Sequence, residues 1–469
     1  MQMKPQTPQR CFIMVTLLAA LLGNRCGTGN EDGTLPVEGI YYVALNGDDQ
    51  NPGTEAQPWR TIQKAAATLV AGDTVFIKTG TYAERVEPKN SGSEGHYITY
   101  AAKPGNTVIL DGTSVNLPEW AGLVDLSEKS YIRISGLRIM NSGPTLHNPG
   151  INADTTDHVI IEKNYVFHTS DAGILVWSSR ETVVADNEVE QPCYNGYNEG
   201  ISVGESEEFE ITGNLVHDSQ KEGICAKDGS ANGKIAANEV CNTAAVGIYV
   251  DAQDKRTHDI EVYGNIVHDT ATNGFALASE QGGLLENVRV FNNVGYANRW
   301  TGLQVTACCI SSHPLANIQI VNNTFYHNGQ PPWGGGILLE NTQAVGVVIR
   351  NNICSQNLTF QIAVDSGVAA ANVTVDHNLI DGFRDGEDEI RGLDSVSGDP
   401  RFVNPSGGDF HLQSDSPAID RGSADGAPAI DFDGQGRPVG MGYDIGADEY
   451  ASAALLGPLF NRTFRRHKT

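Results

Sequence analysis

Apolar and polar residues alternate in short runs along most of this chain, and an asparagine follows each run. No unit contains a helical apolar pattern of about ten residues, so the alternation predicts β-strands rather than helices. Repetition at this period predicts a solenoid, in which stacked units share one core. We therefore expect an all-β parallel β-helix. The shared pattern is apolar-x-apolar-x-x-Asn-x-apolar, and its asparagines recur every 23 to 30 residues at Asn164, Asn187, Asn214, Asn238, Asn265, Asn293, Asn323, Asn352 and Asn378.

The recurring asparagine has an expected structural role. Coils of a parallel β-helix stack at the strand-to-strand distance of about 4.8 Å, so residues at one position of the repeat form a column. We predict that each asparagine turns the chain between two strands and that its amide bonds to the amides above and below. These residues are not assigned to the function.

A solenoid grows by adding coils, so 469 residues require no internal domain boundary. We predict one β-helix over residues 41–395, followed by a C-terminal cap over residues 396–450. An open first coil would expose sheet edges and apolar core. Residues 61–69 have helical spacing, with Ile62, Ala65, Ala66 and Leu69 on one stripe, and this helix is expected to cover that end.

The two ends of the chain indicate export. Lys4 and Arg10 precede an apolar run that is too short to span a bilayer, so residues 1–26 are predicted to be a secretory signal and residues 27–40 a linker. We expect a secreted or cell-surface protein. Cys26 follows the apolar run as a lipoprotein cysteine would, but Arg25 stands where a small residue is needed. The tail, residues 451–469, is too short in apolar residues for a membrane span.

Composition restricts the partners. The net charge of −26 leaves no basic stripe for nucleic acid, and it disfavours an anionic substrate unless a cation or local basic residues intervene. The eight cysteines show no metal-binding spacing, so buried thiols or disulfides are expected. His168, His217 and His268 share one column in our alignment of the coils, where turn packing is preferred to a metal site. A monomer that binds polysaccharide is expected.

The first part of the chain resembles a known superfamily. Residues 40–115 are similar to the N-terminal region of secreted right-handed parallel β-helix proteins of the pectate-lyase-like superfamily. That resemblance implies a right-handed solenoid. It does not specify an activity, because the superfamily includes lyases, glycoside hydrolases, epimerases and non-catalytic members. The motifs that carry it are Tyr41-Tyr42-Val43, Asn51-Pro52-Gly53-Thr54, Pro58-Trp59, Gly72-Asp73-Thr74-Val75 and Gly80-Thr81-Tyr82.

The last part of the chain resembles a second family. It looks like the choice-of-anchor Q module of exported bacterial surface proteins. Asp431 and Asp433 suggest calcium, but a turn-rich cap is the preferred interpretation. The matching segments are Ser416-Pro417-Ala418-Ile419-Asp420, Asp431 to Gly434, Arg437-Pro438 and Asp444-Ile445-Gly446-Ala447.

Aligning the coils on a recurring glycine separates inward from outward positions. Lys227 and Asp251 are predicted to be stacked neighbours on the outer surface, about one strand spacing apart. Tyr249 shares that face, and Asp228 and Glu280 lie at its border. The full outward column reads Trp177, Gly204, Lys227, Asp251, Ala278, Thr306, Glu340 and Asp365.

Carboxylates gather just before the same glycine. Glu199 and Glu222 occupy one column in adjacent coils, where two carboxylates share a proton or bind a cation. With Lys221 and Lys227 they form the densest ionisable cluster of the solenoid. A solvated ladder of charges is the alternative. Aromatic residues near the cluster are predicted to be sugar platforms: Trp177, Tyr194, Tyr197 and Trp300.

The segment from Glu222 to Lys227 is similar to a motif of polysaccharide lyase family 6. The resemblance implies that Lys227 is the Brønsted base and Glu222 a calcium ligand, and Glu199 and Asp228 complete the predicted Ca²⁺ set. β-Elimination needs a base and a cation that neutralises the uronate carboxyl group. Asp251 stands where that family has an arginine. Family 9 pectate lyases place their lysine in another column, which here reads Leu175, Ser202, Cys225, Tyr249, Ala276 and Gln304.

Three functions follow from these patterns. The first is a calcium-assisted polysaccharide lyase with a catalytic group of Lys227, Tyr249, Asp251 and Glu280. The second is a glycoside hydrolase in which Asp251 and Glu280 act as acid and base, since carboxylates on neighbouring coils could lie about 6–9 Å apart. The third is a non-catalytic glycan-binding or adhesive scaffold at the cell surface.

Overall fold

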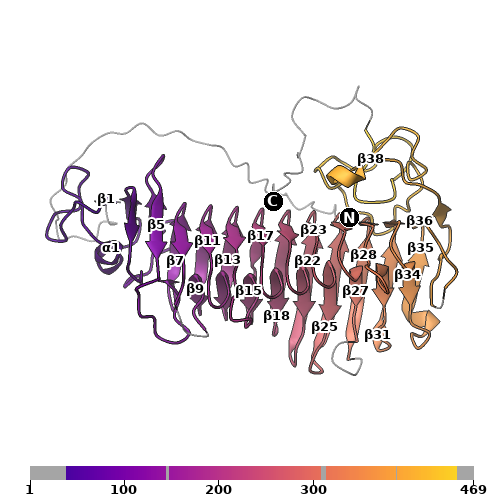
Figure 1. Ribbon diagram of the computed structural model, residues 1–469, viewed down its shortest axis with the longest axis horizontal. Coiled ribbons are helices and arrows are strands. Elements are labelled where there is room, and N and C mark those ends of the chain that lie inside the picture. The colour runs from indigo at the N-terminus through magenta and orange to yellow at the C-terminus, as the bar shows by residue number, and fades with distance from the viewer. Residues whose placement is uncertain (1–38, 144–146, 308–312, 387, 452–469) are drawn as a thin grey trace, which may run out of the picture. The chain divides into compact units, whose positions relative to one another are not determined.

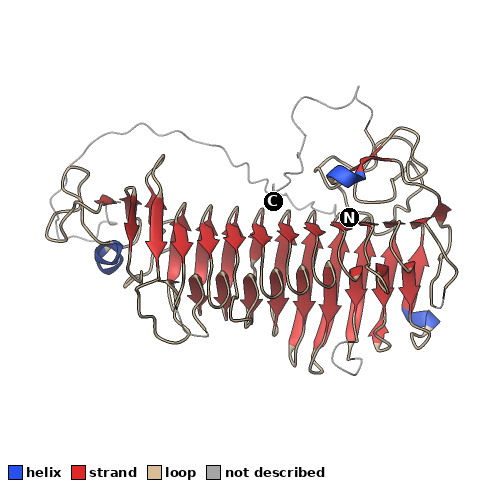
Figure 2. Cartoon of the chain, in the orientation of Figure 1, coloured by secondary structure: helices blue, strands red, loops and turns tan. Residues whose placement is uncertain are grey.

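A computed structural model describes residues 39–143, 147–307, 313–386 and 388–451 of the chain. The predicted signal, Cys26, most of the linker, the tail from residue 452, and Cys308 and Cys309 lie outside the described residues. The described chain winds into a parallel β-helix of about 11 turns (Figure 1). Strands dominate the structure, and the few helical turns lie outside the regular coils (Figure 2). The predicted fold class is confirmed.

Three strands make one typical coil, and each contributes to a different parallel sheet. Sheet A is the longest, and its strands pair only with the preceding and following coils. Its members are β1 (Ile40–Val43), β2 (Thr74–Ile77), β4 (Ile98–Ala102), β7 (Ser130–Ser135), β10 (Asp157–Glu162), β13 (Arg180–Ala185), β16 (Glu210–Thr212), β19 (Ala231–Ala236), β22 (Arg256–Tyr263), β25 (Leu284–Phe291), β28 (Leu315–Val321), β31 (Ala344–Val345), β32 (Val347–Arg350) and β35 (Val373–Asp376).

Sheet B follows each strand of sheet A after a short turn. Most of its strands are three residues long, because a single inward apolar residue suffices to fill the narrow interior. They are β3 (Gly80–Tyr82), β5 (Val108–Asp111), β8 (Arg138–Met140), β11 (Tyr165–Phe167), β14 (Glu188–Glu190), β17 (Leu215–His217), β20 (Glu239–Cys241), β23 (Ile266–His268), β26 (Val294–Tyr296), β29 (Thr324–Tyr326), β33 (Ile353–Ser355), β36 (Leu379–Asp381) and β37 (Val396–Ser397).

Sheet C carries the candidate functional residues. Longer loops lead from sheet B into its strands, and these loops project polar and aromatic residues beside the sheet. Its strands are β6 (Val124–Asp125), β9 (Ile151–Asp154), β12 (Ile174–Trp177), β15 (Ile201–Gly204), β18 (Ile224–Lys227), β21 (Ile248–Asp251), β24 (Phe275–Ala278), β27 (Thr301–Val305), β30 (Gly335–Leu339) and β34 (Phe360–Val364).

The asparagine column forms the hydrogen-bonded ladder that the repeat predicted. Asn238 shows the pattern: its backbone N–H and its side-chain amide both donate to Oδ1 of Asn265, at 2.9 and 3.0 Å. Its own Oδ1 accepts the same two bonds from Asn214, and its amide also reaches the carbonyl of Ile211. The same bonds run from Asn164 to Asn378. Because these polar groups are buried, the ladder satisfies donors that water cannot reach.

The predicted helix covers the first coils. Helix α1 (Ile62–Thr68) begins after Thr61, whose hydroxyl accepts a hydrogen bond from the backbone N–H of Lys64 at 3.1 Å. That bond satisfies one of the free donors at the helix start. Ile62, Ala65 and Ala66 are buried in the main core, so the apolar stripe faces the solenoid as expected.

The C-terminal region packs against the side of the β-helix. Its first two residues, Val396 and Ser397, are the last strand of sheet B. The rest returns along sheet B, and it contains an antiparallel hairpin of β38 (Phe402–Asn404) and β39 (Asp409–Leu412) with a 3₁₀ turn at Pro405–Gly407. A second 3₁₀ turn, Ala370–Asn372, precedes β35. We expected a cap over the last coil; this region, residues 398–450, instead covers a lateral face, and we call it the C-terminal module.

A second set of asparagines explains why the C-terminal module lies there. Asn292, Asn322 and Asn351 each precede a ladder asparagine. The side-chain amide of Asn322 donates to the carbonyls of Asp444 and Gly446 at 2.9 and 3.1 Å. Phe410, Phe432 and Ile445 of the module share a core with residues of sheet B such as Val294 and Ile353. The Asn-Asn pairs in these three coils were therefore a sequence signal for the contact with the C-terminal module, but the repeat pattern alone did not reveal their role.

Candidate active site on sheet C

The predicted outward column exists on sheet C. Trp177 pairs with Gly204, and Gly204 pairs with Lys227. Ala226 pairs with Val250, so Lys227 and Asp251 follow side by side on neighbouring strands, and Asp251 pairs with Ala278. The alignment of coils from the sequence therefore gave the correct register here.

Lys227 and Glu199 form a largely buried ion pair. The Nζ of Lys227 lies 2.8 Å from Oε1 of Glu199, and their side chains are only 13% and 8% exposed. The other carboxylate oxygen of Glu199 accepts a hydrogen bond of 2.5 Å from the hydroxyl of Ser202. Both oxygens of Glu199 are thus engaged, and the lysine is held at the floor of the site.

The ion pair governs the protonation of Lys227. Burial acts to lower its pKa, but the negative charge of Glu199 and its hydrogen bond outweigh burial, and the pKa rises above the ordinary value. Lys227 is therefore an ammonium group at neutral pH. A raised pKa is the opposite of what a lysine needs to accept a proton from a substrate.

Glu222 lies in the coil next to Glu199, since the backbone N–H of Gly200 donates to the carbonyl of Glu222 at 2.9 Å. Burial first, and then the charge of Glu199, raise the pKa of Glu222. Its Oε2 lies 3.4 Å from Nζ of Lys221. The structure thus places the two carboxylates as close neighbours, each with its own lysine.

Asp251 is the most strongly perturbed carboxyl group of the site. Its side chain is fully buried, and this burial raises its pKa to about 7, opposed by the backbone N–H groups of Gln253 and Glu280. Oδ1 accepts the N–H of Glu280 at 3.1 Å, whereas Oδ2 has no hydrogen-bond partner. Near neutral pH Asp251 therefore exists both as a carboxylic acid and as a carboxylate.

Tyr249 and Glu280 lie beside Asp251. The phenol of Tyr249 donates to Oε1 of Glu280 at 2.7 Å, and the amide of Gln253 donates to Oε2 at 3.1 Å. Glu280 is partly exposed, whereas Tyr249 is 9% exposed. The structure therefore brings together Lys227, Tyr249, Asp251 and Glu280 over two coil steps, with Glu280 nearest to solvent.

The predicted calcium ligands do not form one cage. Asp228 interacts with Lys227, Lys255 and Glu205, and it follows the end of β18, whereas Glu222 precedes its start. Ca²⁺ takes six to eight oxygen ligands. Here the ammonium groups of Lys227 and Lys221 already contact the carboxylates of Glu199 and Glu222, in the place that a cation would take. The residues present do not fit a protein-only calcium site, so no chemical step is assigned to calcium.

Exposed aromatic residues flank the site. Among the described residues the large aromatic side chains that are clearly exposed are Trp120, Tyr194, Tyr197, Trp300 and Trp333, and each lies in a loop that leads into a strand of sheet C. Tyr197 and Trp300, both predicted as platforms, are 47% and 44% exposed. Trp177 is only partly exposed because its ring lies over Gly204, where a Cβ would come within 2.2 Å of it.

Trp120 and His147 were missed from the sequence. Their rings stack at 3.8 Å with an interplanar angle of 3°, and Tyr197 meets His147 edge-on at 4.2 Å. Both residues lie in irregular loops outside the repeat pattern, so no column pointed to them. A tryptophan in a polar loop was the one available signal.

The loops also contain a hollow of about 560 Å³, large enough for a sugar ligand. Tyr194 forms one wall, and its ring stacks on His168 at 4.6 Å. The remaining lining is mostly polar, and it includes Asp218, Gln220 and Asn242. The same loop continues to Glu222, which connects the hollow to the ion-paired cluster.

The predicted histidine column is right for His217 and His268, which share it through Cys241, and wrong for His168. His217 pairs with Glu190, and Glu190 pairs with Phe167. His168 therefore lies one residue beyond that column, at the turn. Our alignment of this coil was shifted because Phe167 and His168 both follow the ladder asparagine closely.

The predicted burial of the described cysteines is confirmed: Cys193, Cys225, Cys241 and Cys354 are free, buried thiols.

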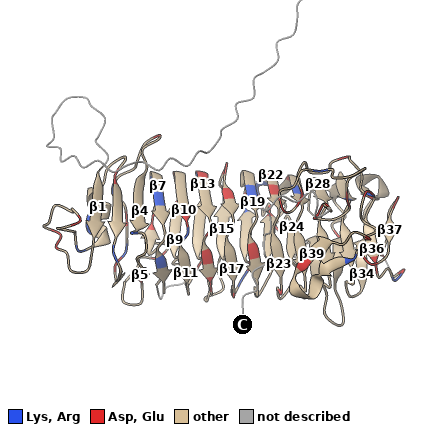
Figure 3. Ribbon diagram, turned by 90° about the horizontal axis from the view of Figure 1, so that it is seen from above, with Lys and Arg blue, Asp and Glu red and all other residues tan. Residues whose placement is uncertain are grey.

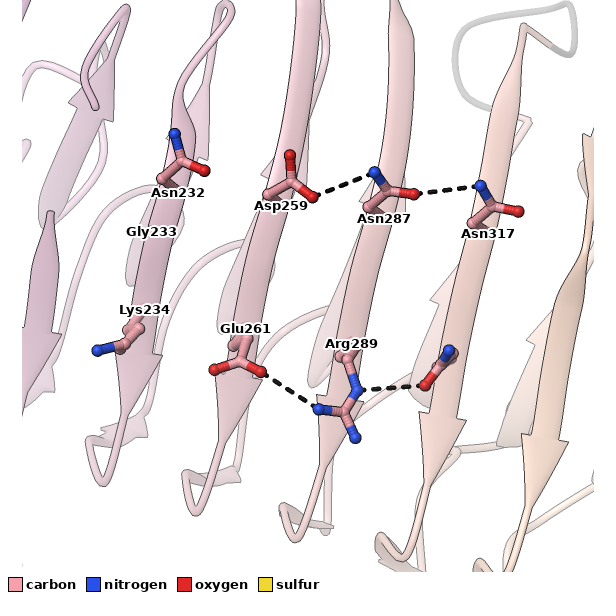
Figure 4. A pocket seen from close by; sticks show the side chains of 9 residues that line it. Asn232, Gly233, Lys234, Asp259, Glu261, Asn287, Arg289 and Asn317 are labelled. Atoms are coloured by element: carbon pink, nitrogen blue, oxygen red, sulfur yellow. Dashed lines mark hydrogen bonds and ion pairs between the residues drawn. The ribbon is translucent and has the colours of Figure 1, made fainter. Parts of the chain in front are cut away.

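A second groove, on the outer face of sheet A, contains none of the predicted site residues. It is a hollow of about 390 Å³ across β19, β22, β25 and β28 (Figure 4). One row of side chains joins Asp259, Asn287 and Asn317 by hydrogen bonds. A parallel row joins Arg289 to Glu261 and Gln319. These groups satisfy one another, so we interpret the groove as a structural polar ladder.

Charge is spread along the solenoid. The positions of acidic and basic residues are interspersed along the strands in the view from above (Figure 3). Within the described parts of the chain, no helix has the length and apolar character needed to cross a bilayer.

Comparison with family models agrees with the geometry. Residues 41–206 match the model described as "Pel9A-like, right handed beta helix region", and residues 193–310 match a model for a right-handed β-helix region. The described chain is thus a right-handed parallel β-helix, and its residues 41–206 are similar to the Pel9A-like type.

Solved structures of other proteins share this pectate-lyase-like fold. The pectate lyase Pel9A is 17% identical, covers 89% of this chain and 98% of its own, and has a TM-score of 0.53. XylC, solved in complex with xylose, is 13% identical, covers 87% and 98%, and has a TM-score of 0.55. At these identities the likeness establishes the fold and no more. The uncharacterized protein YwoF of Bacillus subtilis (strain 168) is 28% identical over 445 residues, which are 83% of this chain and 93% of that protein.

Proposed function

We propose that the protein is a polysaccharide-cleaving enzyme that works on the outer face of sheet C, and that its reaction is glycoside hydrolysis. The observation that carries the proposal is the pair formed by Asp251, whose pKa is raised to about 7, and the neighbouring, more exposed Glu280. Two carboxyl groups with different environments are what acid–base cleavage of a glycosidic bond requires.

The roles follow from burial and protonation. Asp251 in its acid form would give its proton to the glycosidic oxygen through Oδ2, the oxygen without a hydrogen-bond partner. Glu280 would take a proton from the water that attacks the anomeric carbon, while the bond from that carbon to the leaving oxygen breaks. Tyr249 and Gln253 hold the Glu280 carboxylate in place. Since Asp251 is buried, the side chains over it must move when the sugar enters.

The local charge favours a neutral glycan. Two ammonium groups, of Lys221 and Lys227, stand among the four carboxyl groups of Glu199, Glu222, Asp251 and Glu280. A uronate would add further negative charge to this groove, which is unfavourable without an added cation. The XylC complex supports a neutral sugar as a ligand for this fold.

A calcium-assisted lyase is the second candidate. It is supported by the Pel9A-like family model and by the paired carboxylates of Glu199 and Glu222. In that reaction Lys227 would be the base, which requires that it lose the contact with Glu199 that raises its pKa. Export, which such activities require, remains a prediction for residues 1–26.

The two chemistries are separable in one assay. Neutral and uronate polysaccharides are incubated with the protein, with Ca²⁺ or chelator, and both reducing ends and the ultraviolet absorbance of unsaturated products are followed. We expect reducing ends from a neutral glycan without added Ca²⁺, and a loss of about 10²- to 10⁴-fold in Glu280→Gln. Asp365→Asn, a carboxylate of the same column outside the site, is the matched control.

Other outcomes of that assay would reassign the site. Unsaturated products that require Ca²⁺ and vanish in Lys227→Ala would establish elimination with Lys227 as the base. Binding without any product from either set of polymers would leave the protein as a glycan-binding scaffold.

The aromatic residues give a prediction about binding. Trp300→Ala is expected to weaken polysaccharide binding by about 1–2 kcal/mol, roughly 5- to 30-fold, because an exposed ring next to the site provides a stacking surface. Its side chain is 44% exposed, so stability should change little. Titration calorimetry with the substrate glycan measures the effect. Met441→Ala, an exposed apolar residue of the C-terminal module, is the control, and equal affinities of the two variants would remove Trp300 from the binding surface.

A further inference from the structure

The C-terminal module contains a cluster of polar side chains that the proposed function does not use. On β39 the residues alternate, so Phe410 and Leu412 enter the core while Asp409 and His411 share the opposite face. Ligand atoms of His411, Asp433 and Asp448 all lie within 4.8 Å of one another. The fold thus places Asp433 and Asp448, which are distant from His411 in the sequence, next to this histidine.

The histidine is oriented as a metal ligand would be. Nδ1 of His411 lies 2.6 Å from Oδ1 of Asp409, and Nε2 lies 2.7 Å from Oδ2 of Asp433. In metal sites the non-ligating ring nitrogen commonly donates to a carboxylate, which fixes the ring and leaves the other nitrogen for the ion. Asp409 is in that outer position, and Nε2 lies against the carboxylate of Asp433.

The second observation is an unsatisfied oxygen. The side chain of Asp433 is 6% exposed, and its Oδ1 is buried without a hydrogen-bond partner. Three carboxylates, of Asp409, Asp433 and Asp448, surround one imidazole. Neighbouring Asp431 is a further carboxylate, and its oxygens accept hydrogen bonds from backbone N–H groups. Even a protonated His411 balances only one of these three charges, and the net negative charge that remains is unfavourable unless a further cation compensates it.

The cluster is compact, and only a small, mostly apolar space lies beside it. A cavity of about 10 Å³ adjoins it, at the lower limit for one water-sized body, and its lining is Val294, Phe410, His411, Phe432, Ala447 and Asp448. Metal–ligand distances of about 2.1 Å would require Nε2 of His411 and Oδ2 of Asp433 to separate to roughly 3.3 Å. That is a small movement from the present hydrogen-bond distance.

We propose that His411, Asp433 and Asp448 bind one divalent transition-metal ion, with Asp409 as the residue that positions His411. One imidazole nitrogen with carboxylate oxygens suits Zn²⁺ or Mn²⁺ better than Ca²⁺, which prefers oxygen ligands alone. Val294 belongs to β26, so the ion lies where the C-terminal module meets the β-helix. It would stabilise the docking of the module on sheet B.

The test uses the full-length protein, freed of metal by chelator. Zn²⁺, Mn²⁺ and Ca²⁺ chlorides are added separately, and bound metal per chain and the thermal midpoint are measured. We expect one Zn²⁺ or Mn²⁺ per chain and a rise of several degrees in the midpoint. Both should be lost in His411→Ala and Asp433→Asn, reduced in Asp409→Asn, and kept in His158→Ala, a histidine on β10 of sheet A.

Two results would overturn the proposal. One is a metal-free protein that binds neither Zn²⁺ nor Mn²⁺, or that is stabilised by Ca²⁺ alone. The other is metal binding that persists in Asp433→Asn, which would place the ion elsewhere. Co²⁺ bound to the unmodified protein keeps the test independent of variant folding: its visible spectrum should show nitrogen and oxygen ligands, and a spectrum of solvated ion would contradict the site.

Discussion

Asp251→Asn is expected to abolish most of the activity and to make the protein more stable above neutral pH. Removing the acid should cost about 10²- to 10⁴-fold in kcat. The ionised carboxylate is fully buried with one oxygen unpartnered, so its replacement by a neutral amide removes an unfavourable charge. The difference in pKa of about 3 between the folded chain and an ordinary aspartate corresponds to up to about 4 kcal/mol.

The sign of the pH dependence is specific. The folded protein holds the Asp251 proton up to about pH 7, whereas the unfolded chain releases it near pH 4. The contribution of Asp251 to stability therefore falls as the pH rises from about 4 through 7, and the loss is complete above that range. Urea denaturation at pH 4.5 and pH 8 measures it. Asp251→Asn should have a larger free energy of unfolding than the natural protein only at pH 8. An increase that is equal at both pH values would show that ionisation of Asp251 is not its cause. Asp365→Asn should show no increase.

Asn238→Ala should produce the largest loss of stability among single substitutions in the solenoid, about 3–5 kcal/mol. The side chain of Asn238 bonds to the two neighbouring coils. Its removal leaves the buried N–H of Asn214 and the carbonyl of Ile211 without this partner. Each orphaned buried group costs about 1–3 kcal/mol.

The urea midpoint measures this loss, and Asn195→Ala is the control. Asn195 is an exposed loop asparagine outside the ladder, so its replacement should change stability by less than about 0.5 kcal/mol. A loss below about 1 kcal/mol in Asn238→Ala would mean that neighbouring coils re-form the bonds with their own groups.

The repeating part of the structure was predictable because its rules are local. One asparagine per coil fixed the period, and alternation fixed which residues face inward, so Lys227 and Asp251 could be placed side by side before any coordinates. The capping helix followed from its apolar stripe.

Other features of the site and of the C-terminal module depend on contacts that the repeat period does not predict. Trp120 and His147 meet Tyr197 only because long loops fold over the coils. The partner of Lys227 could not be chosen from the sequence, since Glu199 and Asp251 were both within reach and the choice depends on side-chain direction. The lateral position of the C-terminal module depends on asparagines more than a hundred residues before it.

The direction of the asparagine ladder bears on how the chain assembles. The bonds between ladder asparagines all run one way: each asparagine, from Asn164 to Asn352, donates to the side-chain oxygen of the asparagine in the next coil. Toward the preceding coil its side-chain amide donates only to a backbone carbonyl, as Asn238 does to Ile211. As the chain emerges from the ribosome, the asparagine of each finished coil thus lacks only the hydrogen-bond acceptor in the next coil, and it needs no residue beyond that coil. A nascent β-helix of any length therefore ends in one ladder asparagine whose N–H groups lack their acceptor. The free-energy cost of this unpaired end does not increase as coils are added one at a time.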